Sequence, residues 1–213
     1  MKLGLLGGTF NPIHLAHLRI AEEAREAACL DQVLFIPAPD PPHKPLVGDV
    51  PFGSRYDMVR LAIAGNPLFA VSDIEARRGG KSYTVETLLT LLKERPGDEL
   101  HFIIGSDSFL ELAHWHRYAE IFSLTSLVVV ERPDSKVVNP LLQLPGAVRD
   151  DFRQESASLL QHKSGATLRF VPGTRLDISS SYLRELLACG RSVRYLIPAV
   201  VEEYIAQKGL YRS

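Results

Sequence analysis

The chain has 213 residues, of which 46% are hydrophobic and 23% are charged, and its formal net charge is −1. This composition is typical of a globular protein that buries one substantial core, so we expect a single domain over residues 1–213. The near-neutral charge argues against a dedicated nucleic-acid binder, because such proteins concentrate surplus Lys and Arg on one face.

Cysteine content and hydropathy indicate the compartment. The chain has only two cysteines, Cys29 and Cys189, and they are far apart in the sequence. This implies no disulfide framework and suits a protein of the reducing cytosol. No apolar run approaches the roughly 20 residues that span a bilayer, and the first residues lack a signal-peptide pattern. We therefore expect a cytoplasmic protein that binds no membrane.

Short apolar runs rich in Val, Ile and Phe alternate with longer segments of helical spacing. The expected strands are 3–6, 33–36, 69–71, 100–104, 127–130 and 168–171. The expected helices are 15–28, 55–64, 85–94, 181–187 and 199–207. Continuous apolar strands separated by helices predict a doubly wound α/β fold with a mainly parallel sheet. The pattern is weakest over residues 134–165.

The first expected strand runs into glycines and two histidines, Gly7-Gly8-Thr9-Phe10-Asn11-Pro12-Ile13-His14-Leu15-Ala16-His17. Glycines let a backbone approach a ligand, and a helix N-terminus favours an anion. We expect Asn11 to cap a helix that begins at Pro12, with His14 and His17 on one face of its first turns. The alternatives are a surface helix that merely carries two histidines, or a metal pair. Zinc-binding histidines on a helix usually stand four apart, which disfavours the metal.

Polar segments also follow other expected strands, at the edge where parallel α/β sheets bind ligands. The proline-rich residues 37–45 predict a semi-rigid loop that presents His43 and Lys44, with a plain linker as the alternative. Two standard phosphate motifs do not fit. The dinucleotide fingerprint fails after residue 6, and Glu75 stands where a P-loop ending in Gly80-Lys81-Ser82 requires its first glycine.

A second motif lies near the C-terminus, Ile178-Ser179-Ser180-Ser181-Tyr182-Leu183-Arg184. It opens the expected helix with three hydroxyl residues and places an arginine about one turn inside. The serines can cap the helix, which is the simpler interpretation, or bind phosphate oxygens. Arg184 can reach the same anion, and a guanidinium suits a polyphosphate.

Taken together, the two motifs resemble those of the nucleotidylyltransferase superfamily, His-x-Gly-His near the start and Ile-Ser-Ser-Thr-x-x-Arg near the end. Within it the chain is most similar to the bacterial nicotinate-nucleotide adenylyltransferases. Five further segments follow in that family's order, namely Pro41-Pro42-His43-Lys44, Lys81-Ser82-Tyr83-Thr84, Gly105-Ser106-Asp107, Trp115-His116 and Arg132-Pro133. Ala16 replaces the usual glycine and Ser181 the usual threonine. Neither change removes a charge or a donor, so we expect activity to survive.

The resemblance implies a Rossmann-like fold and transfer of the adenylyl group of ATP to nicotinate mononucleotide in NAD biosynthesis. It implies catalytic roles for His14, His17, Lys44 and Arg184. It implies ATP contacts at Gly7, Gly8, Thr9, Phe10, Gly105, Asp107, Ile178, Ser179, Ser180 and Ser181. It implies contacts to the mononucleotide at His43, Lys44, Ser82, Tyr83, Thr84, Trp115, His116 and Arg132. Mg²⁺ is expected to arrive on ATP, without a dedicated metal site of the protein.

Three alternatives stay open at this point. A phosphopantetheine adenylyltransferase shares both terminal motifs but resembles a shorter chain without the Trp115 region. A catalytically silent nucleotide-binding regulator would keep the fold without the reaction. A cytidylyltransferase with an alcohol phosphate as acceptor is the third. The sequence also leaves a homo-oligomer open.

Overall fold

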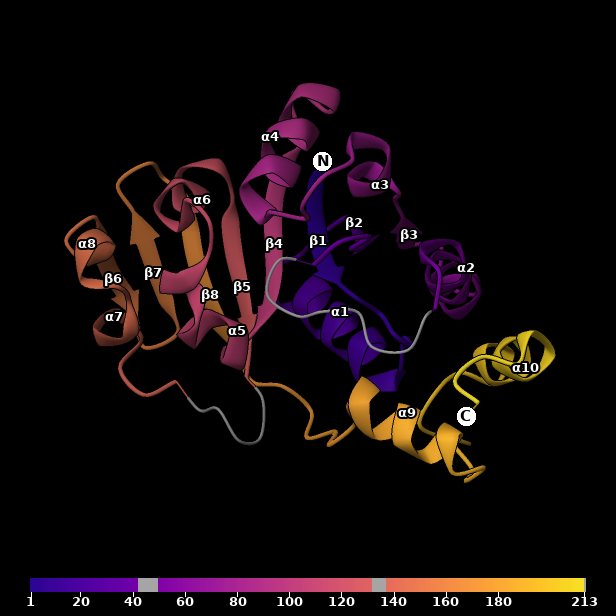
Figure 1. The fold of residues 1–213 in the computed structure, drawn as a ribbon. Helices are drawn as coiled ribbons and strands as arrows, with labels where there is room; N and C mark the ends of the chain where they lie inside the picture. The colour runs from indigo at the N-terminus through magenta and orange to yellow at the C-terminus, as the bar shows by residue number, and fades with distance from the viewer. Residues whose placement is uncertain (42–49, 132–136, 213) are drawn as a thin grey trace. The chain divides into compact units, whose positions relative to one another are not determined.

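The computed structural model describes residues 1–41, 50–131 and 137–212. Its described residues form an eight-stranded sheet in the order β3-β2-β1-β4-β5-β8-β7-β6 (Figure 1). The strands are β1 (Lys2–Gly8), β2 (Gln32–Pro37), β3 (Phe69–Val71), β4 (Glu99–Gly105), β5 (Ser126–Val130), β6 (Phe152–Ser156), β7 (Leu159–His162) and β8 (Thr167–Val171). The β1–β4, β4–β5 and β5–β8 pairs are parallel, whereas β6–β7 and β7–β8 are antiparallel. The fold is therefore α/β with a mainly parallel sheet, as the sequence predicts.

The five helices expected from the sequence are all present, as α1 (Leu15–Ala27), α2 (Phe52–Ile63), α4 (Thr84–Glu94), α9 (Ser180–Ala188) and α10 (Ala199–Lys208). The structure adds α3 (Ile74–Arg78), α5 (Ser106–Leu110), η1 (Leu112–His114), α6 (Tyr118–Leu124), α7 (Pro140–Gln143) and α8 (Gly146–Arg149). These additions have three to seven residues, too few for an apolar helical period to emerge from the sequence.

The central strands are apolar because they are covered on both faces. Every residue of β5 is buried, and so are the middle residues of β1 and β4. The parallel register places Leu5 opposite Phe102, and Phe102 opposite Leu127. The chain order of the sheet reverses at β1, and open α/β sheets bind ligands at the carboxyl end of the strand where this happens.

The β6–β7 hairpin occupies the region of weakest sequence pattern. In β6 only Phe152 is buried and the other residues are exposed, so the strand shows no apolar alternation. In β7 the buried positions alternate, as expected for a sheet with one solvated face. The edge-on contact between the Phe122 and Phe152 rings, 5.0 Å between centroids, anchors the hairpin to α6. This long-range contact leaves no local sequence signal.

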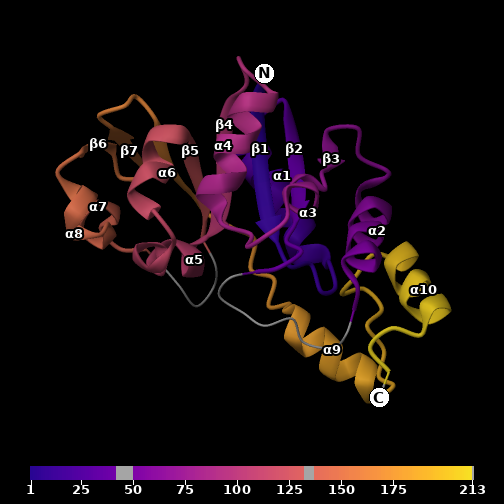
Figure 2. The same ribbon diagram turned by 45° about the horizontal axis from the view of Figure 1, so that its top comes forward.

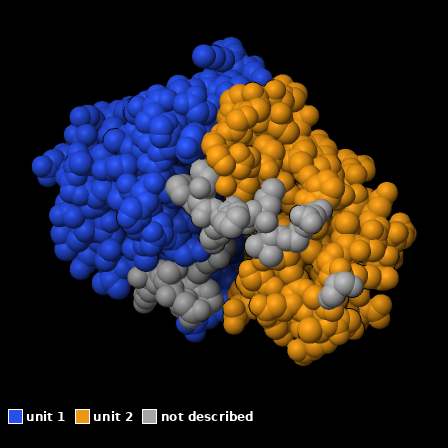
Figure 3. Space-filling view, in the orientation of Figure 1, with its two compact units in different colours: residues 1–6, 20–33, 83–175 blue, residues 7–19, 34–82, 176–213 orange. Residues whose placement is uncertain are grey.

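The chain divides into two compact units, coloured in Figure 3. Unit 1 contains residues 1–6, 20–33 and 83–175, and unit 2 contains residues 7–19, 34–82 and 176–213. In unit 2, α10 lies beside α2 in both ribbon views (Figures 1 and 2), and the Tyr204 hydroxyl donates to Asp57 Oδ2 at 3.3 Å. The expectation of one domain stays a prediction. Among the described residues, no helix combines the length and apolar character needed to cross a bilayer.

Candidate active site

The loop after β1 carries the first motif. Helix α1 begins at Leu15, as the expected helix 15–28 has it, so only the interpretation of the turn as a helix start at Pro12 with Asn11 as its cap is wrong. Asn11 and Pro12 form a turn instead. The Asn11 side chain is engaged elsewhere, because its Oδ1 accepts a hydrogen bond of 2.6 Å from the Tyr211 hydroxyl. A tertiary contact has overridden the local capping pattern.

The two histidines lie against each other in unit 2. Their rings are stacked, with 3.6 Å between centroids and 26° between planes. His14 precedes the helix and is 3% exposed, whereas His17 is half-buried in the first turn. The His14 backbone N–H donates to Nδ1 of His17 at 3.3 Å. In a neutral imidazole this leaves the proton on Nε2, which makes Nε2 of His17 a donor for an anion.

Phe10 shapes the loop between strand and histidines. Its φ is 47°, a left-handed conformation that costs a non-glycine residue roughly 1–2 kcal/mol. The buried ring meets His17 edge-on at 5.1 Å and contacts Phe35 at 5.9 Å. A Cβ on Gly8 would lie 3.1 Å from this ring, closer than an ordinary van der Waals contact, so the glycine lets the ring pack closely against the backbone. Aromatic packing thus holds a strained turn at the end of β1, as is common at functional sites.

The second motif meets the first within unit 2. The Ser180 hydroxyl donates to the Pro12 carbonyl oxygen at 2.9 Å, and Arg184 Nη1 donates to the Asn11 carbonyl oxygen at 2.9 Å. Both side chains come from α9 (Figure 1). The two segments that the sequence singles out at opposite ends of the chain therefore form one hydrogen-bonded cluster.

The three serines of the second motif act differently. Ser179 caps α9, because its side chain accepts from the Tyr182 backbone N–H at 3.2 Å, so the simpler capping interpretation holds for this residue. Ser181 Oγ accepts from Arg184 Nη2 at 3.1 Å and orients the guanidinium. A guanidinium has five N–H donors, so Arg184 keeps further donors for an anion.

Besides Tyr211, the sequence interpretation misses a second residue that contacts this loop, Arg55 on α2. Its side chain is fully buried, and Nη1 donates to the carbonyl oxygens of Thr9 at 2.7 Å and Ala38 at 2.8 Å. Burial lowers the pKa of Arg55, but a guanidinium remains charged in proteins. The sequence does contain a signal for Arg55. Its spacing from Met58 and Val59 places it on the buried face of α2, where an arginine among apolar residues is unusual.

Unit 1 holds four of the predicted residues for the second substrate, namely Tyr83, Thr84, Trp115 and His116. Trp115 is half-buried and meets Phe102 at 6.1 Å between centroids, with the planes at 85°. The exposed His116 ring lies 4.4 Å from the Tyr83 ring. Thr84 is the first residue of α4.

Ion pairs hold the segment that carries Trp115 and His116. Arg117 has a φ of 50° and pairs with Glu86 of α4 at 2.7 Å and with Glu120 of α6 at 2.6 Å. These two carboxylates raise the pKa of Arg117, mainly through the hydrogen bonds that Arg117 donates to Glu120. The ion pairs fix the turn that follows the tryptophan.

Other predicted residues lie in separate segments. Asp107 is exposed in the first turn of α5, directly after Gly105 at the end of β4. In unit 2, the Ser82 backbone N–H donates to the Asp40 carbonyl oxygen at 3.0 Å, and the Ser82 hydroxyl accepts from the Asp40 N–H at 3.4 Å. The predictions for His43, Lys44 and Arg132 lie outside the described residues.

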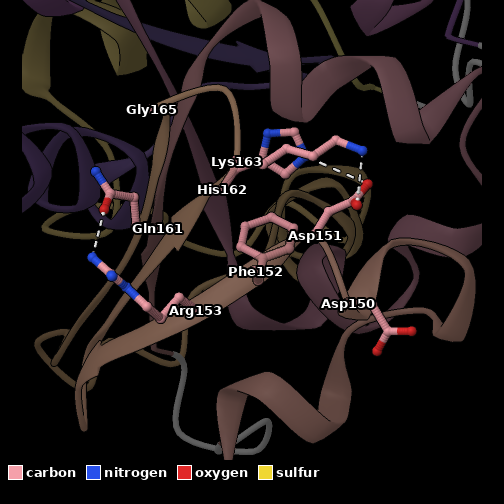
Figure 4. Close-up of a pocket in the computed structure, with 8 residues that line it drawn as sticks. All are labelled: Asp150, Asp151, Phe152, Arg153, Gln161, His162, Lys163 and Gly165. Atoms are coloured by element: carbon pink, nitrogen blue, oxygen red, sulfur yellow. Dashed lines mark hydrogen bonds and ion pairs between the residues drawn. The ribbon is translucent and has the colours of Figure 1, made fainter.

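A cavity of about 390 Å³ opens beside the β6–β7 hairpin in unit 1 (Figure 4). None of the predicted site residues lines it. Two pairs of its polar side chains interact: Lys163 binds Asp151 at 2.8 Å, and Arg153 Nη2 donates to Gln161 at 3.4 Å. Because neither of the two sequence motifs lines this cavity, we do not place the active site there.

The buried His162 beside this cavity gives a prediction for stability. Burial lowers the pKa of His162 below its ordinary value of 6.5, although Asp151 opposes the shift, and burial also lowers the pKa of His101. The unfolded chain therefore binds these protons at higher pH than the folded chain. We expect the free energy of unfolding to fall as the pH decreases from about 7 to 5.5.

Urea unfolding at several pH values measures this dependence. His162→Gln removes one of the titrating groups and should flatten the slope. The matched control is His114→Gln, at a histidine whose side chain is 75% exposed. Equal slopes in both variants would contradict the role of His162.

The fold and the joined motifs define a nucleotide-binding protein of the cytidylyltransferase-like class, and the model of the Cytidylyltransferase-like family matches residues 5–186. A "Probable nicotinate-nucleotide adenylyltransferase" of Trichlorobacter lovleyi is 69% identical over 212 residues, covering 100% of both chains. One of Geobacter sulfurreducens is 52% identical, covering 99% of this chain and 98% of the relative. The chain belongs to this family, the nicotinate-nucleotide adenylyltransferases.

Solved structures show the same fold. Plasmodium falciparum nicotinic acid mononucleotide adenylyltransferase, complexed with NaAD, superimposes with a TM-score of 0.76 at 18% identity, covering 99% of this chain and 97% of that one. A putative nicotinate-nucleotide adenylyltransferase from Vibrio parahaemolyticus gives a TM-score of 0.66 at 20% identity, covering 100% and 97%. The Rossmann-like nucleotidylyltransferase fold predicted from the sequence is thereby confirmed.

Proposed function

We propose that the protein transfers the adenylyl group of ATP to nicotinate mononucleotide, forming nicotinate adenine dinucleotide and pyrophosphate in NAD biosynthesis. The observation that carries this proposal is the joining of the Gly-Thr-Phe-Asn-Pro loop to Ser180 and Arg184. The joining occurs in a chain that is 69% identical over its full length to a relative named for this activity.

The reaction needs positioning and charge stabilisation more than proton transfer. The attacking phosphate of the mononucleotide has a second pKa of about 6 and is largely ionised at neutral pH, so no general base is required. Its oxygen forms a bond to the α-phosphorus of ATP, and the bond from that phosphorus to the bridging oxygen of pyrophosphate breaks. The protein must align the two anions and stabilise the charge that builds on the α-phosphate and the leaving group.

Unit 2 supplies the contacts to the phosphates of ATP in this proposal. Nε2 of His17 donates to a phosphate oxygen, and His14 supports the ring by stacking. The backbone of the loop from Gly8 to Phe10 surrounds the phosphates. Arg184 contributes the donors that it does not use for Asn11 and Ser181, and a phosphate oxygen competes with Pro12 for the Ser180 hydroxyl.

Magnesium is proposed to enter with ATP, since this ion keeps most of its waters and binds through phosphate oxygens. Across residues 1–41, 50–131 and 137–212, no three His, Cys, Asp or Glu side chains lie together in a way that could hold a metal ion. When bound, Mg²⁺ neutralises charge on the polyphosphate.

Unit 1 supplies the contacts to the mononucleotide. The nicotinate ring is flat and cationic, and Trp115 is the stacking partner that we assign to it. Thr84 and the backbone near His116 would donate hydrogen bonds to the pyridine carboxylate. A site with donors alone matches a carboxylate and mismatches the amide of nicotinamide mononucleotide. Asp107 is assigned to the ribose hydroxyls of adenosine.

Removing the stacking partner should weaken one substrate only. For Trp115→Ala we expect the KM for nicotinate mononucleotide to rise about 2- to 30-fold, the range of a cation–π contact, with the KM for ATP unchanged. Trp115→Phe keeps an aromatic face and should recover part of the loss. Steady-state kinetics with each substrate varied in turn provide the measurement. An unchanged KM for the mononucleotide in the alanine variant would remove the stacking role.

A chromatographic endpoint assay tests the proposed reaction. Mg-ATP is incubated in separate tubes with nicotinate mononucleotide, nicotinamide mononucleotide or phosphopantetheine. We expect strong product only from the nicotinate substrate. Product only from phosphopantetheine would mean that phosphopantetheine, and not nicotinate mononucleotide, is the acceptor. No product in any tube would favour a nucleotide-binding protein without catalytic activity.

A further inference from the structure

The loop 8–12 is held by side chains from three distant segments of unit 2, which bind its backbone and the side chain of Asn11. Ser180 and Arg184 come from α9, Arg55 comes from α2, and Tyr211 follows α10. We propose that Arg55 and Tyr211 are positioning residues for ATP: they fix the conformation in which this loop binds the phosphates, and neither contacts the nucleotide. The inference rests on the proposed function, since it assumes that the loop binds ATP.

Arg55 helps to set the direction in which the loop presents its backbone N–H groups. In a trans peptide group the carbonyl and the following N–H point in opposite directions. The Gly8 carbonyl accepts from the Ala38 N–H at 2.9 Å, and the Thr9 carbonyl accepts from Arg55 at 2.7 Å. The N–H groups of Thr9 and Phe10 are therefore turned away from the end of β2 and from α2. Successive N–H groups with this orientation can serve a phosphate-binding turn.

The burial of Arg55 is unfavourable for packing alone. Desolvating a guanidinium costs several kcal/mol, and an apolar residue of similar volume is often as stable or more stable at such a position. No described residue accepts a hydrogen bond from Nε or Nη2 of Arg55, so part of its capacity is unused in the fold. The guanidinium carbon also lies over the Phe52 ring, 5.7 Å from its centroid. A cation next to a loop that binds a polyphosphate attracts this anion, which accounts for a charged residue at this buried position.

Tyr211 fixes the opposite end of the loop. Its hydroxyl donates to Asn11 Oδ1 at 2.6 Å, while Arg184 binds the main-chain oxygen of the same asparagine. Burial raises the pKa of the Tyr211 phenol, although Arg184 and Arg55 oppose the shift, so the hydroxyl keeps its proton and remains a donor. Asn11 is thus held by both its side chain and its backbone.

The test compares Tyr211→Phe, which removes a single hydroxyl, with Tyr204→Phe. Tyr204 is the matched control, because its hydroxyl also donates to a side chain, Asp57, but does not touch the loop. Calorimetric titration with Mg-ATP alone gives the Kd, and steady-state kinetics give the KM of each substrate. We expect the Kd and KM for ATP to rise about 3- to 10-fold in Tyr211→Phe, the effect of one lost neutral hydrogen bond. The KM for nicotinate mononucleotide should stay within about twofold of wild type.

Arg55 is tested by rescue. Arg55→Met should weaken ATP binding by about 10-fold or more, and Arg55→Lys, which keeps a charged donor, should recover part of the loss. Arg60→Lys, on the same helix but 60% exposed, serves as the control. Thermal unfolding of every variant gives its folded fraction, and the measured ATP binding is corrected for that fraction.

Three outcomes are separable. Weaker ATP binding in Tyr211→Phe but not in Tyr204→Phe supports the inference, whether or not the Arg55 variants fold. Unchanged ATP binding in Tyr211→Phe, or an equal loss in the control, overturns it while wild-type activity still supports the proposed function. A wild-type protein that binds no Mg-ATP would overturn the proposed function itself, and the inference with it.

Discussion

His17→Ala is expected to lower kcat by about 100- to 1,000-fold in a protein that remains folded, the loss typical of removing one preorganised donor from a developing charge. His17 is suited to this role because the His14 N–H occupies Nδ1 and leaves Nε2 as the donor. Stacking on His14 and the edge-on contact with Phe10 fix the ring before ATP arrives. Single-turnover measurements at saturating substrates would report the chemical step directly.

The control for this variant is His114→Ala. His114 is an exposed histidine paired with Glu111 in unit 1. Replacing it with alanine removes the same kind of side chain as in His17→Ala but leaves the loop after β1 unchanged. Circular dichroism and thermal unfolding should show both variants folded. Full turnover in His17→Ala would contradict the assignment of His17 to the transition state, and loss in both variants would point to a general effect on folding.

Much of the fold follows from short-range patterns. The buried parallel strands read as continuous apolar runs because both of their faces are covered, and each of them is predicted close to its observed position. The β6–β7 hairpin escapes prediction because β6 buries only Phe152 and depends on ring contacts with a distant helix. A strand stabilised by such a contact has no local signature.

The candidate site also contains features that have a local sequence signal and features that have none. The two motifs are recognisable because turn glycines, adjacent histidines and helix-opening serines are local features, and the structure places them together through Pro12 and Ser180. The part played by Asn11 is not predictable locally, since its side chain accepts a hydrogen bond from Tyr211, 200 residues away, and does not cap α1. The role of Arg55 is not predictable for a related reason. The periodicity of a helix indicates which of its faces is buried, but not which groups a buried cation binds.

Arg184→Met is expected to lower kcat/KM for ATP by about 100-fold or more, because it removes a multidentate cation from the polyphosphate site and a donor from the loop. The guanidinium is aligned by hydrogen bonds to the Asn11 carbonyl oxygen and to Ser181 Oγ, which leave its remaining N–H groups for phosphate oxygens. Kinetics with ATP varied, together with titration of Mg-ATP, measure the loss. Arg191→Met, at an exposed arginine just beyond α9, is the control and should retain wild-type kinetics.

Arg184→Lys separates the two tasks of this side chain. A lysine ammonium can bind a phosphate as a point charge, but it cannot hold Asn11 and Ser181 at the same time with the planar geometry of a guanidinium. We therefore expect the lysine variant to recover part of the ATP affinity while kcat stays low, since charge is restored but the alignment of the loop is not. Recovery of kcat and affinity together would mean that charge alone suffices. In that case the hydrogen bonds of Arg184 to the loop would contribute little to catalysis.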